Sequence, residues 1–239
     1  MIVVSAGMPR SGTGWVYNLT NDLFVAAGYM PAGRVRKRFG MQMVLRPHNN
    51  SVGKPGAVKL VALTLPHLLG QRFAVKTHAN PTGALRAWVK LGAAKVHYSY
   101  RDPRDVVVSA WEEGERMRKR GKTTSFAAYT TIEQTIDAVA NWLHGWDTWM
   151  AYEPALKLRY EEMKADTLGQ VRRLCDHYKL KIGEEQMRGV VEKYAPGNKQ
   201  VGAHFVKGVT GRYREALTED QVKLCEEKFG PWLQKMGYA

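Results

Sequence analysis

The residues of this chain whose types and spacing most clearly suggest chemistry lie between Gly7 and Trp15, which read Gly-Met-Pro-Arg-Ser-Gly-Thr-Gly-Trp. This stretch follows a β-branched apolar run at residues 2–4 and precedes a helical pattern that ends near Gly28. A glycine-rich turn between a strand and a helix lets the backbone approach an anion closely. The first N–H groups and the dipole of the helix then favour negative charge. The stretch therefore predicts a P-loop-like strand–turn–helix that binds phosphate.

The side chains within this turn limit the class of anion site. Arg10 supplies a charged fork of donors, and Ser11 and Thr13 supply hydroxyl groups. The phosphate loop of ATPases requires G-x-x-x-x-G-K-[ST]. Gly7 and Gly12 have this spacing, but Thr13 stands where the lysine belongs. The turn alone favours anion binding over an ordinary strand–helix connection, and it does not predict an ATPase.

A second polar cluster, Lys76-Thr77-His78, lies at the end of an apolar strand candidate at residues 72–76. In open α/β sheets, ligands gather outside the carboxyl ends of the strands. A lone histidine is most often structural. One that lies at a strand end, two residues after a lysine, is a better candidate for a general base, because imidazole titrates near ~6.5.

A third cluster follows the strand candidate at residues 94–100. Arg101 lies at its tip, and Ser109 lies eight residues later in a predicted helix. Together they could hold a second phosphate. Alternatively, Arg101 forms a structural salt bridge with Asp102 or Asp105, and the residues alone leave both readings open.

The remaining pattern predicts the elements that position these clusters. A fourth strand is expected at residues 155–160. Apolar spacing predicts helices over residues 58–69, 81–92, 106–111, 126–152, 167–180, 184–194 and 218–236. Residues 29–55 are interpreted as an irregular insertion, and the glycine-rich residues 196–211 as a mobile loop. The alternation predicts a single α/β domain over residues 1–239, with a mostly parallel sheet of about four to five strands flanked by helices on both faces.

The amino-acid composition limits the kinds of molecule that this protein is expected to bind. The chain has 36 Lys and Arg against 22 Asp and Glu, a formal net charge of +14, which favours anionic ligands. No recognised nucleic-acid motif accompanies the charge, so no nucleic-acid partner is expected. No apolar run reaches the length of a membrane span and no secretory leader is evident, so we expect a cytoplasmic protein without a membrane partner. Cys175 and Cys225 have no metal-ligand spacing and are predicted to be reduced and buried.

Five segments, in order along the chain, resemble the sulfotransferases that use 3′-phosphoadenosine 5′-phosphosulfate (PAPS), especially the cytosolic and related bacterial enzymes. The segments at residues 9–15, 76–78, 100–109, 160–166 and 205–211 are similar to the family motifs P-K-S-G-T-T-W, K-T-H, Y-R-N-P-K-D-V-x-V-S, Y-E-D-M-K-x-D and R-K-G-x-x-G. Three departures are Arg10 for the loop lysine, Gly14 for a threonine and Val206 for an arginine.

The resemblance implies in-line transfer of a sulfuryl group from PAPS to a hydroxyl or amine of a small molecule, with release of 3′-phosphoadenosine 5′-phosphate (PAP) and no metal. It implies that His78 is the general base, that Lys76 neutralises the transferring group, and that Arg10 replaces the loop lysine. It also favours Arg101 and Ser109 as ligands of the 3′-phosphate. The implied cofactor-binding residues are Arg10, Ser11, Gly12, Thr13, Gly14, Trp15, Arg101, Ser109, Tyr160, Lys207 and Gly208.

Several alternatives stay open at this point. The rivals are a kinase of the phosphate-loop class and a non-catalytic module that binds polyanions. The acceptor is expected to contact residues 29–55 and 119–125, whose positive charge points to an acidic or phenolic molecule. The family's dimer signature, K-x-x-x-T-V-x-x-x-E, survives only as Arg214 and Thr218 at its first and fifth positions, which leaves the oligomeric state open.

Overall fold

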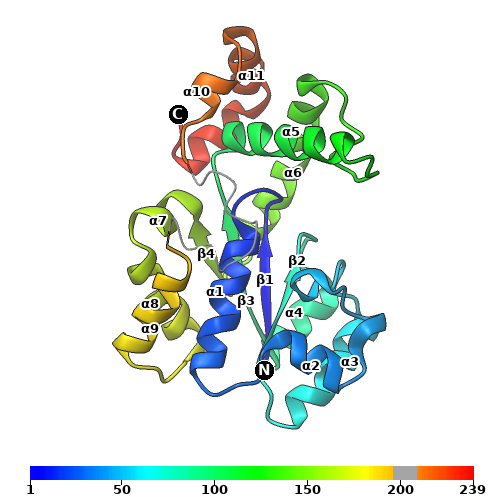
Figure 1. Ribbon diagram of the computed structural model, residues 1–239, viewed down its shortest axis with the longest axis vertical. Coiled ribbons are helices and arrows are strands. Elements are labelled where there is room, and N and C mark those ends of the chain that lie inside the picture. The colour runs from blue at the N-terminus through cyan, green and yellow to red at the C-terminus, as the bar shows by residue number, and fades with distance from the viewer. Residues whose placement is uncertain (196–208) are drawn as a thin grey trace.

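The sheet at the centre of the molecule carries the residues of all three polar clusters. In the computed structural model, which describes residues 1–195 and 209–239, four strands lie in the order β2-β1-β3-β4 and all three pairings are parallel (Figure 1). The strands are β1 (Ile2–Gly7), β2 (Phe73–Thr77), β3 (Ala94–Tyr100) and β4 (Ala155–Arg159). β1 and β2 are buried along their whole length, as strands covered on both faces must be. The predicted parallel α/β sheet is confirmed.

The helices connect and cover these strands. They are α1 (Thr13–Ala26), α2 (Ala32–Arg38), α3 (Ala57–Leu68), α4 (Gly83–Lys90), α5 (Pro103–Lys119), α6 (Ile132–Met150), α7 (Tyr160–Ala165), α8 (Thr167–Tyr178), α9 (Glu184–Lys193), α10 (Tyr213–Ala216) and α11 (Glu219–Met236). Two short 3₁₀ turns, η1 (Met41–Met43) and η2 (His48–Asn50), follow α2.

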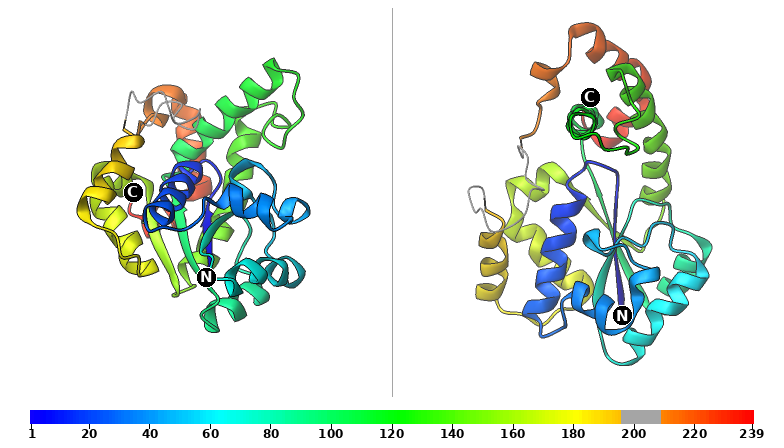
Figure 2. Two further views of the ribbon diagram at one scale, coloured as in Figure 1. Left: turned by 60° about the horizontal axis from the view of Figure 1, so that its bottom comes forward. Right: turned by 45° about the vertical axis from the view of Figure 1, so that its right-hand side comes forward.

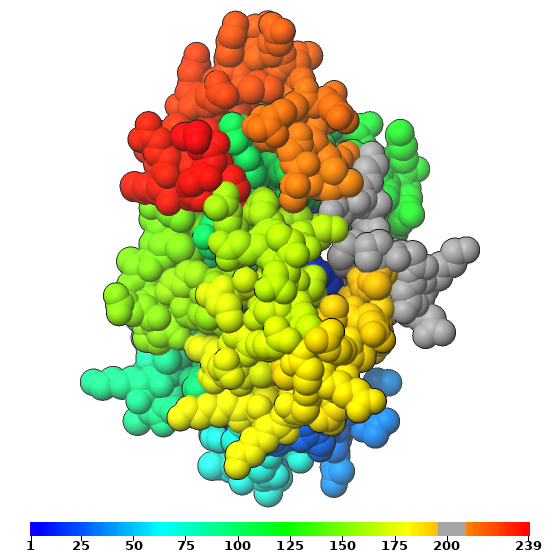
Figure 3. Space-filling model, turned by 90° about the vertical axis from the view of Figure 1, so that its left-hand side faces the viewer, coloured from blue at the N-terminus to red at the C-terminus, as the bar shows by residue number. Residues whose placement is uncertain are grey.

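Side chains that alternate along the strands point into two separate cores. Val3 of β1 packs in a core with residues of α1, α8 and α9, whereas Ile2 and Val4 belong to the core on the opposite face. That opposite core includes residues of α3, α4, α6 and α11. Figure 3 shows α8 and α9, in yellow, forming the outer layer on one side of the molecule. Helices therefore cover both faces of the sheet, as expected.

The C-terminal part of the chain lies beyond the carboxyl ends of the strands. Figure 2 shows α5 end-on above these strand ends, with α6 and α11 beside it. The side chain of Asp102 accepts a hydrogen bond from the Arg104 backbone N–H and caps α5. Thr218 and Gln221 form a capping box at the start of α11, where that helix was predicted to begin.

Two local predictions were wrong. Residues 29–55 are not an irregular insertion, because they contain α2 and two 3₁₀ turns. α2 is short and rich in arginine, and only Ala32 and Val35 are buried, so it has almost no apolar period to detect. Tyr160 does not extend β4 but begins α7. Most of the predicted loop at residues 196–211 lies outside the described residues.

Other structural expectations can be compared directly. Cys175 and Cys225 are free and buried, as predicted. The tryptophans of α6 at positions 146 and 149 are also buried and belong to the core. Within the described ranges, no helix is long and apolar enough to cross a membrane.

Candidate active site

A cleft of about 840 Å³ lies at the carboxyl ends of the strands and is lined by residues of the β1–α1 turn, of β2 and of α5. It brings together most of the residues singled out from the sequence. Those that line it are Arg10, Gly12, Thr13, Gly14, Trp15, Lys76, His78, Arg101, Ser109 and Tyr160. Ser11 is fully buried behind the cleft wall. Lys207 and Gly208 lie outside the described residues.

The turn between β1 and α1 is held in a tight shape by its backbone. Arg10 and Gly12 adopt left-handed conformations, with φ of 65° and 75°. A Cβ atom at Gly12 would lie 2.6 Å from the ring of Tyr160, so only glycine fits. The Ser11 hydroxyl lies 2.6 Å from the carbonyl of Met8 and 3.0 Å from that of Ser99, which ties the turn to β3. Ser11 therefore holds the turn from behind instead of presenting its hydroxyl to the cleft.

The start of α1 presents backbone donors to this cleft. Gly12, Thr13 and Gly14 lie at the first turn of the helix and line the cleft. In the part of the chain that the structure describes, no group accepts a hydrogen bond from their N–H groups. The first N–H groups of a helix lack partners within it, and together with the helix dipole they favour an anion. The turn has the geometry of an anion site.

The tautomer of His78 follows from its hydrogen bond. The Nδ1 atom lies 2.7 Å from the carbonyl oxygen of Gly7. Because a carbonyl oxygen only accepts, Nδ1 must carry the proton and Nε2 keeps its lone pair. His78 is exposed to the open cleft, but the protein around the ring limits its hydration, and together with the Lys76 ammonium this lowers the pKa of His78 to about 4. The side chain is therefore neutral at pH 7, with an unprotonated nitrogen able to accept a proton.

Two cations, Lys76 and Arg10, lie next to His78. Lys76 is buried at the end of β2, and desolvation and the Arg10 charge lower its pKa to about 8. The Arg10 side chain extends toward α5, where its Nε donates to Ser109 Oγ at 3.2 Å and its Nη1 lies 3.2 Å from Glu113. Burial lowers the pKa of Arg10 from its ordinary value. An anion in the cleft would restore the charge balance of this cationic cluster.

The surroundings of Arg101 combine both readings of its role. Its guanidinium donates to Asp105 at 2.8 Å, which is one of the salt bridges considered from sequence. The same residue lines the cleft, lies over the ring of Tyr160 at 4.5 Å, and donates to the Val209 carbonyl. Its buried Nε has no hydrogen-bond partner among the described residues. Arg101 thus forms a structural ion pair with Asp105 and still has a donor, its Nε, that could bind a ligand.

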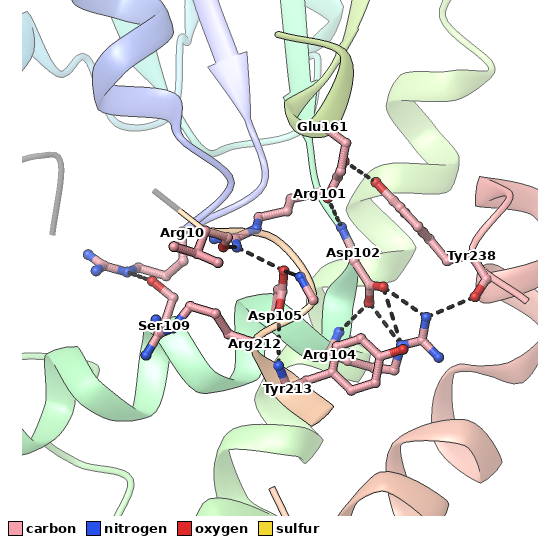
Figure 4. A network of polar contacts seen from close by, with 12 residues as sticks. Arg10, Arg101, Asp102, Arg104, Asp105, Ser109, Glu161, Arg212, Tyr213 and Tyr238 are labelled. Atoms are coloured by element: carbon pink, nitrogen blue, oxygen red, sulfur yellow. Dashed lines mark hydrogen bonds and ion pairs between the residues drawn. The ribbon is translucent and has the colours of Figure 1, made fainter. Parts of the chain in front are cut away.

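Asp105 is the centre of this part of the site (Figure 4). Its fully buried carboxylate accepts from Arg101, from the Gly211 backbone N–H at 2.8 Å and from the Tyr213 backbone N–H at 3.1 Å. Three donors from two distant segments therefore converge on one carboxylate. The contact holds residues 211–213 next to Arg101 and fixes the guanidinium at the edge of the cleft.

Sequence reasoning missed several residues of the cleft. They include two arginines, two glutamates and a group of apolar and aromatic side chains: Arg116, Arg212, Glu112, Glu113, Met117, Phe126, Tyr129 and Trp142. Most of those on α5 follow Ser109 at helical spacing, so the face of the helix that contains Ser109 could have identified them. Arg212 forms an ion pair with Glu112, a contact between distant segments that leaves no signal in the sequence.

Comparisons with known proteins agree with this geometry. The sulfotransferase domain family matches residues 2–237. Rat sulfotransferase 2A2 is 32% identical over 107 residues, which are 43% of this chain and 37% of that protein. Cytosolic sulfotransferase 17 of Arabidopsis thaliana is 31% identical over 176 residues, which are 59% and 51% of the two chains. The chain thus matches about half, or less, of the length of these curated relatives.

Solved structures share the fold. Mouse sulfotransferase SULT7A1 complexed with PAP has a TM-score of 0.62 at 17% identity, over 98% of this chain and 84% of that one. Retinol dehydratase in complex with androsterone and the inactive cofactor PAP has a TM-score of 0.60 at 21% identity, over 97% and 80%. Because the family match extends over nearly all of its residues, the chain belongs to the sulfotransferase domain family.

Proposed function

We propose that this chain transfers the sulfuryl group of PAPS to a hydroxyl or amine of a small-molecule acceptor and releases PAP. The observation that carries the proposal is one cleft that contains a helix-start anion site, a neutral histidine with a free Nε2 lone pair, and buried cations. The relatives named as sulfotransferases, and the similar structures that hold PAP, support it. The family match over residues 2–237 supports one domain for residues 1–239.

The described residues fit a ligand with two separate phosphate-type groups. The backbone N–H groups of Gly12, Thr13 and Gly14 suit one anionic group, with Arg10 and Lys76 close by. Arg101, whose buried Nε lacks a described partner, suits the second together with Ser109. PAPS carries both kinds of group, and when bound it supplies the sulfuryl group that is transferred.

His78 removes the proton of the acceptor in this proposal. Its Nε2 accepts the proton while Nδ1–H donates to Gly7 and keeps the ring in place. Sulfuryl transfer is chemically close to phosphoryl transfer, so the protein mainly positions groups and stabilises charge. Lys76 and Arg10 neutralise the charge that develops on the transferring and leaving oxygens. Arg10 cannot donate a proton at neutral pH, so its role is electrostatic.

The remaining cofactor-binding roles extend this assignment. Arg101 and Ser109 bind the 3′-phosphate, and Asp105 positions Arg101. Trp15 and Tyr160, whose rings meet edge to face with centroids 6.0 Å apart, form part of the wall beside the adenine. Lys207 and Gly208 close over the 3′-phosphate, a role that rests on the family resemblance alone.

The acceptor is proposed to be acidic or phenolic. Phe126, Tyr129 and Trp142 form an aromatic part of the cleft, and Arg120 adds positive charge beside Arg116, which is paired with Glu113. Aromatic walls suit a flat ring, and the arginines suit a carboxylate or phenolate. The retinol dehydratase structure contains androsterone, a small-molecule ligand of that protein.

A cytoplasmic location is also proposed for this chain, and it rests on the names of the plant relatives.

Binding of PAP tests the proposed function without knowledge of the acceptor. A ligand at ~100 times its Kd stabilises the folded protein by about 2.7 kcal/mol. For a chain of this size we expect PAP to raise Tm by roughly 5–10 °C. ATP with magnesium and adenosine 5′-phosphate are the controls and are expected to give much smaller shifts. A shift with ATP alone would instead favour a kinase.

A titration of His78 in the ligand-free protein tests its assigned state. The pKa of His78 is lowered, so the ring is expected to remain neutral down to well below pH 6.5 and to become charged only in acid. NMR of the ring nitrogens is expected to show a proton on Nδ1 at pH 7. A proton on Nε2, or a pKa at or above 6.5, would argue against His78 as the base.

A further inference from the structure

The basic residues of the chain are unevenly distributed along its sequence. Residues 23–100 contain twelve Lys and Arg residues and no Asp or Glu. This segment, which includes α2, α3 and α4, therefore contributes +12 of the formal net charge of +14. The rest of the chain is close to neutral.

The described residues provide no ion-pair partner for this charge. None of the twelve basic side chains forms an ion pair with any residue in the described ranges, whereas α5, α8, α9 and α11 each take part in at least one. The exposed members are Arg34, Lys37, Arg38, Arg46, Lys54, Arg86 and Lys90. Basic side chains without ion-pair partners among the described residues attract an anionic partner.

The same segment, residues 23–100, carries an exposed apolar stripe along α3. Leu60 and Leu63 on the inner face of the helix are fully buried. The outer face is also apolar, with side chains spaced three or four residues apart. These outer residues and their exposed fractions are Val58 at 84%, Val61 at 59%, Leu65 at 55% and Leu68 at 75%. A surface helix normally turns polar side chains outward, so this stripe needs a partner.

A further exposed apolar residue follows α4, the helix that lies beside α3. The indole Nε1 of Trp88 donates to Thr64 Oγ1 at 3.2 Å, which sets α4 beside α3. Each helix leads back to the start of a parallel strand, so both run toward the same end of the sheet. Leu91, which is 78% exposed just after α4, therefore lies toward the same end of the sheet as Leu68 and Leu69, which end α3.

We infer that this α3–α4 surface, defined by Val58, Val61, Leu65, Leu68, Leu69 and Leu91, binds the surface of membranes that contain anionic lipids. Apolar side chains of an interfacial helix enter the acyl boundary while basic side chains contact the headgroups. Exposed leucines that project from a helix suit a deformable apolar phase and have no counterpart in nucleic-acid binding. A second copy of this chain would bring two positively charged segments together, so lipid is the better occupant.

The surface lies on the membrane and does not cross it. α3 has 12 residues, whereas a spanning helix needs about 20. The expectation of no membrane partner was based on the lack of a long apolar run, which does not exclude a short helix lying in the interface. Because the residues that line the cleft include none from α3 or α4, this inference is independent of the proposed function.

Co-sedimentation with vesicles tests the inference. The full chain is expected to bind vesicles of phosphatidylcholine with about one third phosphatidylglycerol, and to bind pure phosphatidylcholine at least about tenfold more weakly. Raising the salt concentration should weaken binding, because surface charges are screened. The double variant Leu65→Ser/Leu68→Ser is expected to bind the anionic vesicles at least about tenfold more weakly. Met43→Ser, which changes a 96% exposed side chain outside α3 and α4, is the matched control and should bind normally.

The outcomes separate lipid from the other occupants. Loss of binding in the double variant, with Tm and the PAP-induced shift in Tm unchanged, supports the inference. The inference is overturned if the wild type does not bind anionic vesicles, or if the double variant binds them as tightly as the wild type does. Sedimentation analysis supplies a second check, since a wild-type dimer that dissociates in the double variant would show that a second copy covers the stripe.

Discussion

Replacing His78 with alanine is expected to lower kcat by a factor of about 10²–10⁴ and to leave the affinity for PAP within about twofold of the wild type. The effect on kcat follows because Nε2 of His78 is the nitrogen that accepts the acceptor's proton. PAP affinity is spared because the ring is not assigned a contact with either phosphate group. Steady-state kinetics together with calorimetric titration of PAP measure the two quantities separately.

His78→Asn is the matched control for this change. Its amide N–H₂ can still donate to the Gly7 carbonyl that Nδ1 of His78 contacts at 2.7 Å, but asparagine is not a base at neutral pH. Both variants should therefore be equally inactive. Turnover close to that of the wild type in either of them would remove His78 from the catalytic role.

Replacing Arg101 with alanine is expected to raise the Kd of PAP by about tenfold to a hundredfold, as for loss of a hydrogen bond to a charged group. Adenosine 5′-phosphosulfate lacks the 3′-phosphate, so its Kd should rise by less than about threefold. The selectivity follows from the position of Arg101, which lines the cleft and has a buried Nε without a partner among the described residues. Equal losses for both ligands would mean that Arg101 serves only its ion pair with Asp105.

Asp105→Asn distinguishes positioning from simple structural support. The amide preserves the shape of the side chain but removes the charge that holds Arg101 and the backbone of Gly211 and Tyr213. We expect a lower Tm, since a buried ion pair is broken, and also a selective loss of PAP affinity in the same direction as for Arg101→Ala. A lower Tm with equal weakening of PAP and adenosine 5′-phosphosulfate would limit Asp105 to stability.

The sequence predicts the positions of the strand ends well, because local patterns determine them. A β-branched run marks β1, the polar and turn residues after each strand candidate mark where β1, β2 and β3 end, and parallel strands bring those ends to one edge of the sheet. His78 and His97 show how the position of a histidine along a strand determines whether it faces the cleft or the core. His78 lies just beyond a strand end and faces the cleft, whereas His97 lies within β3, fully buried between Ser5 and Tyr178.

Features that depend on packing could not be predicted in this way. The predicted hydroxyl donor Ser11 lies inside the protein, because the turn closes against Ser99 of β3. Arg116 enters the cleft only because α5 crosses above the strand ends. The helix at residues 58–69 was predicted close to its bounds, but its spacing did not reveal that apolar side chains lie on both its inner and outer faces.

Turnover with PAPS is the measurement that tests the central claim most directly. The chain would be incubated with PAPS and a panel of phenols, hydroxylated sugars and amines, and mass spectrometry would follow both PAP and the modified acceptor. The account predicts that one acceptor class gains a sulfuryl group, with one PAP released per product and no requirement for ATP. Phosphorylated product formed from ATP and magnesium would contradict it and indicate a kinase. Binding of heparin without turnover of PAPS by any acceptor class would also contradict it and indicate a polyanion-binding module.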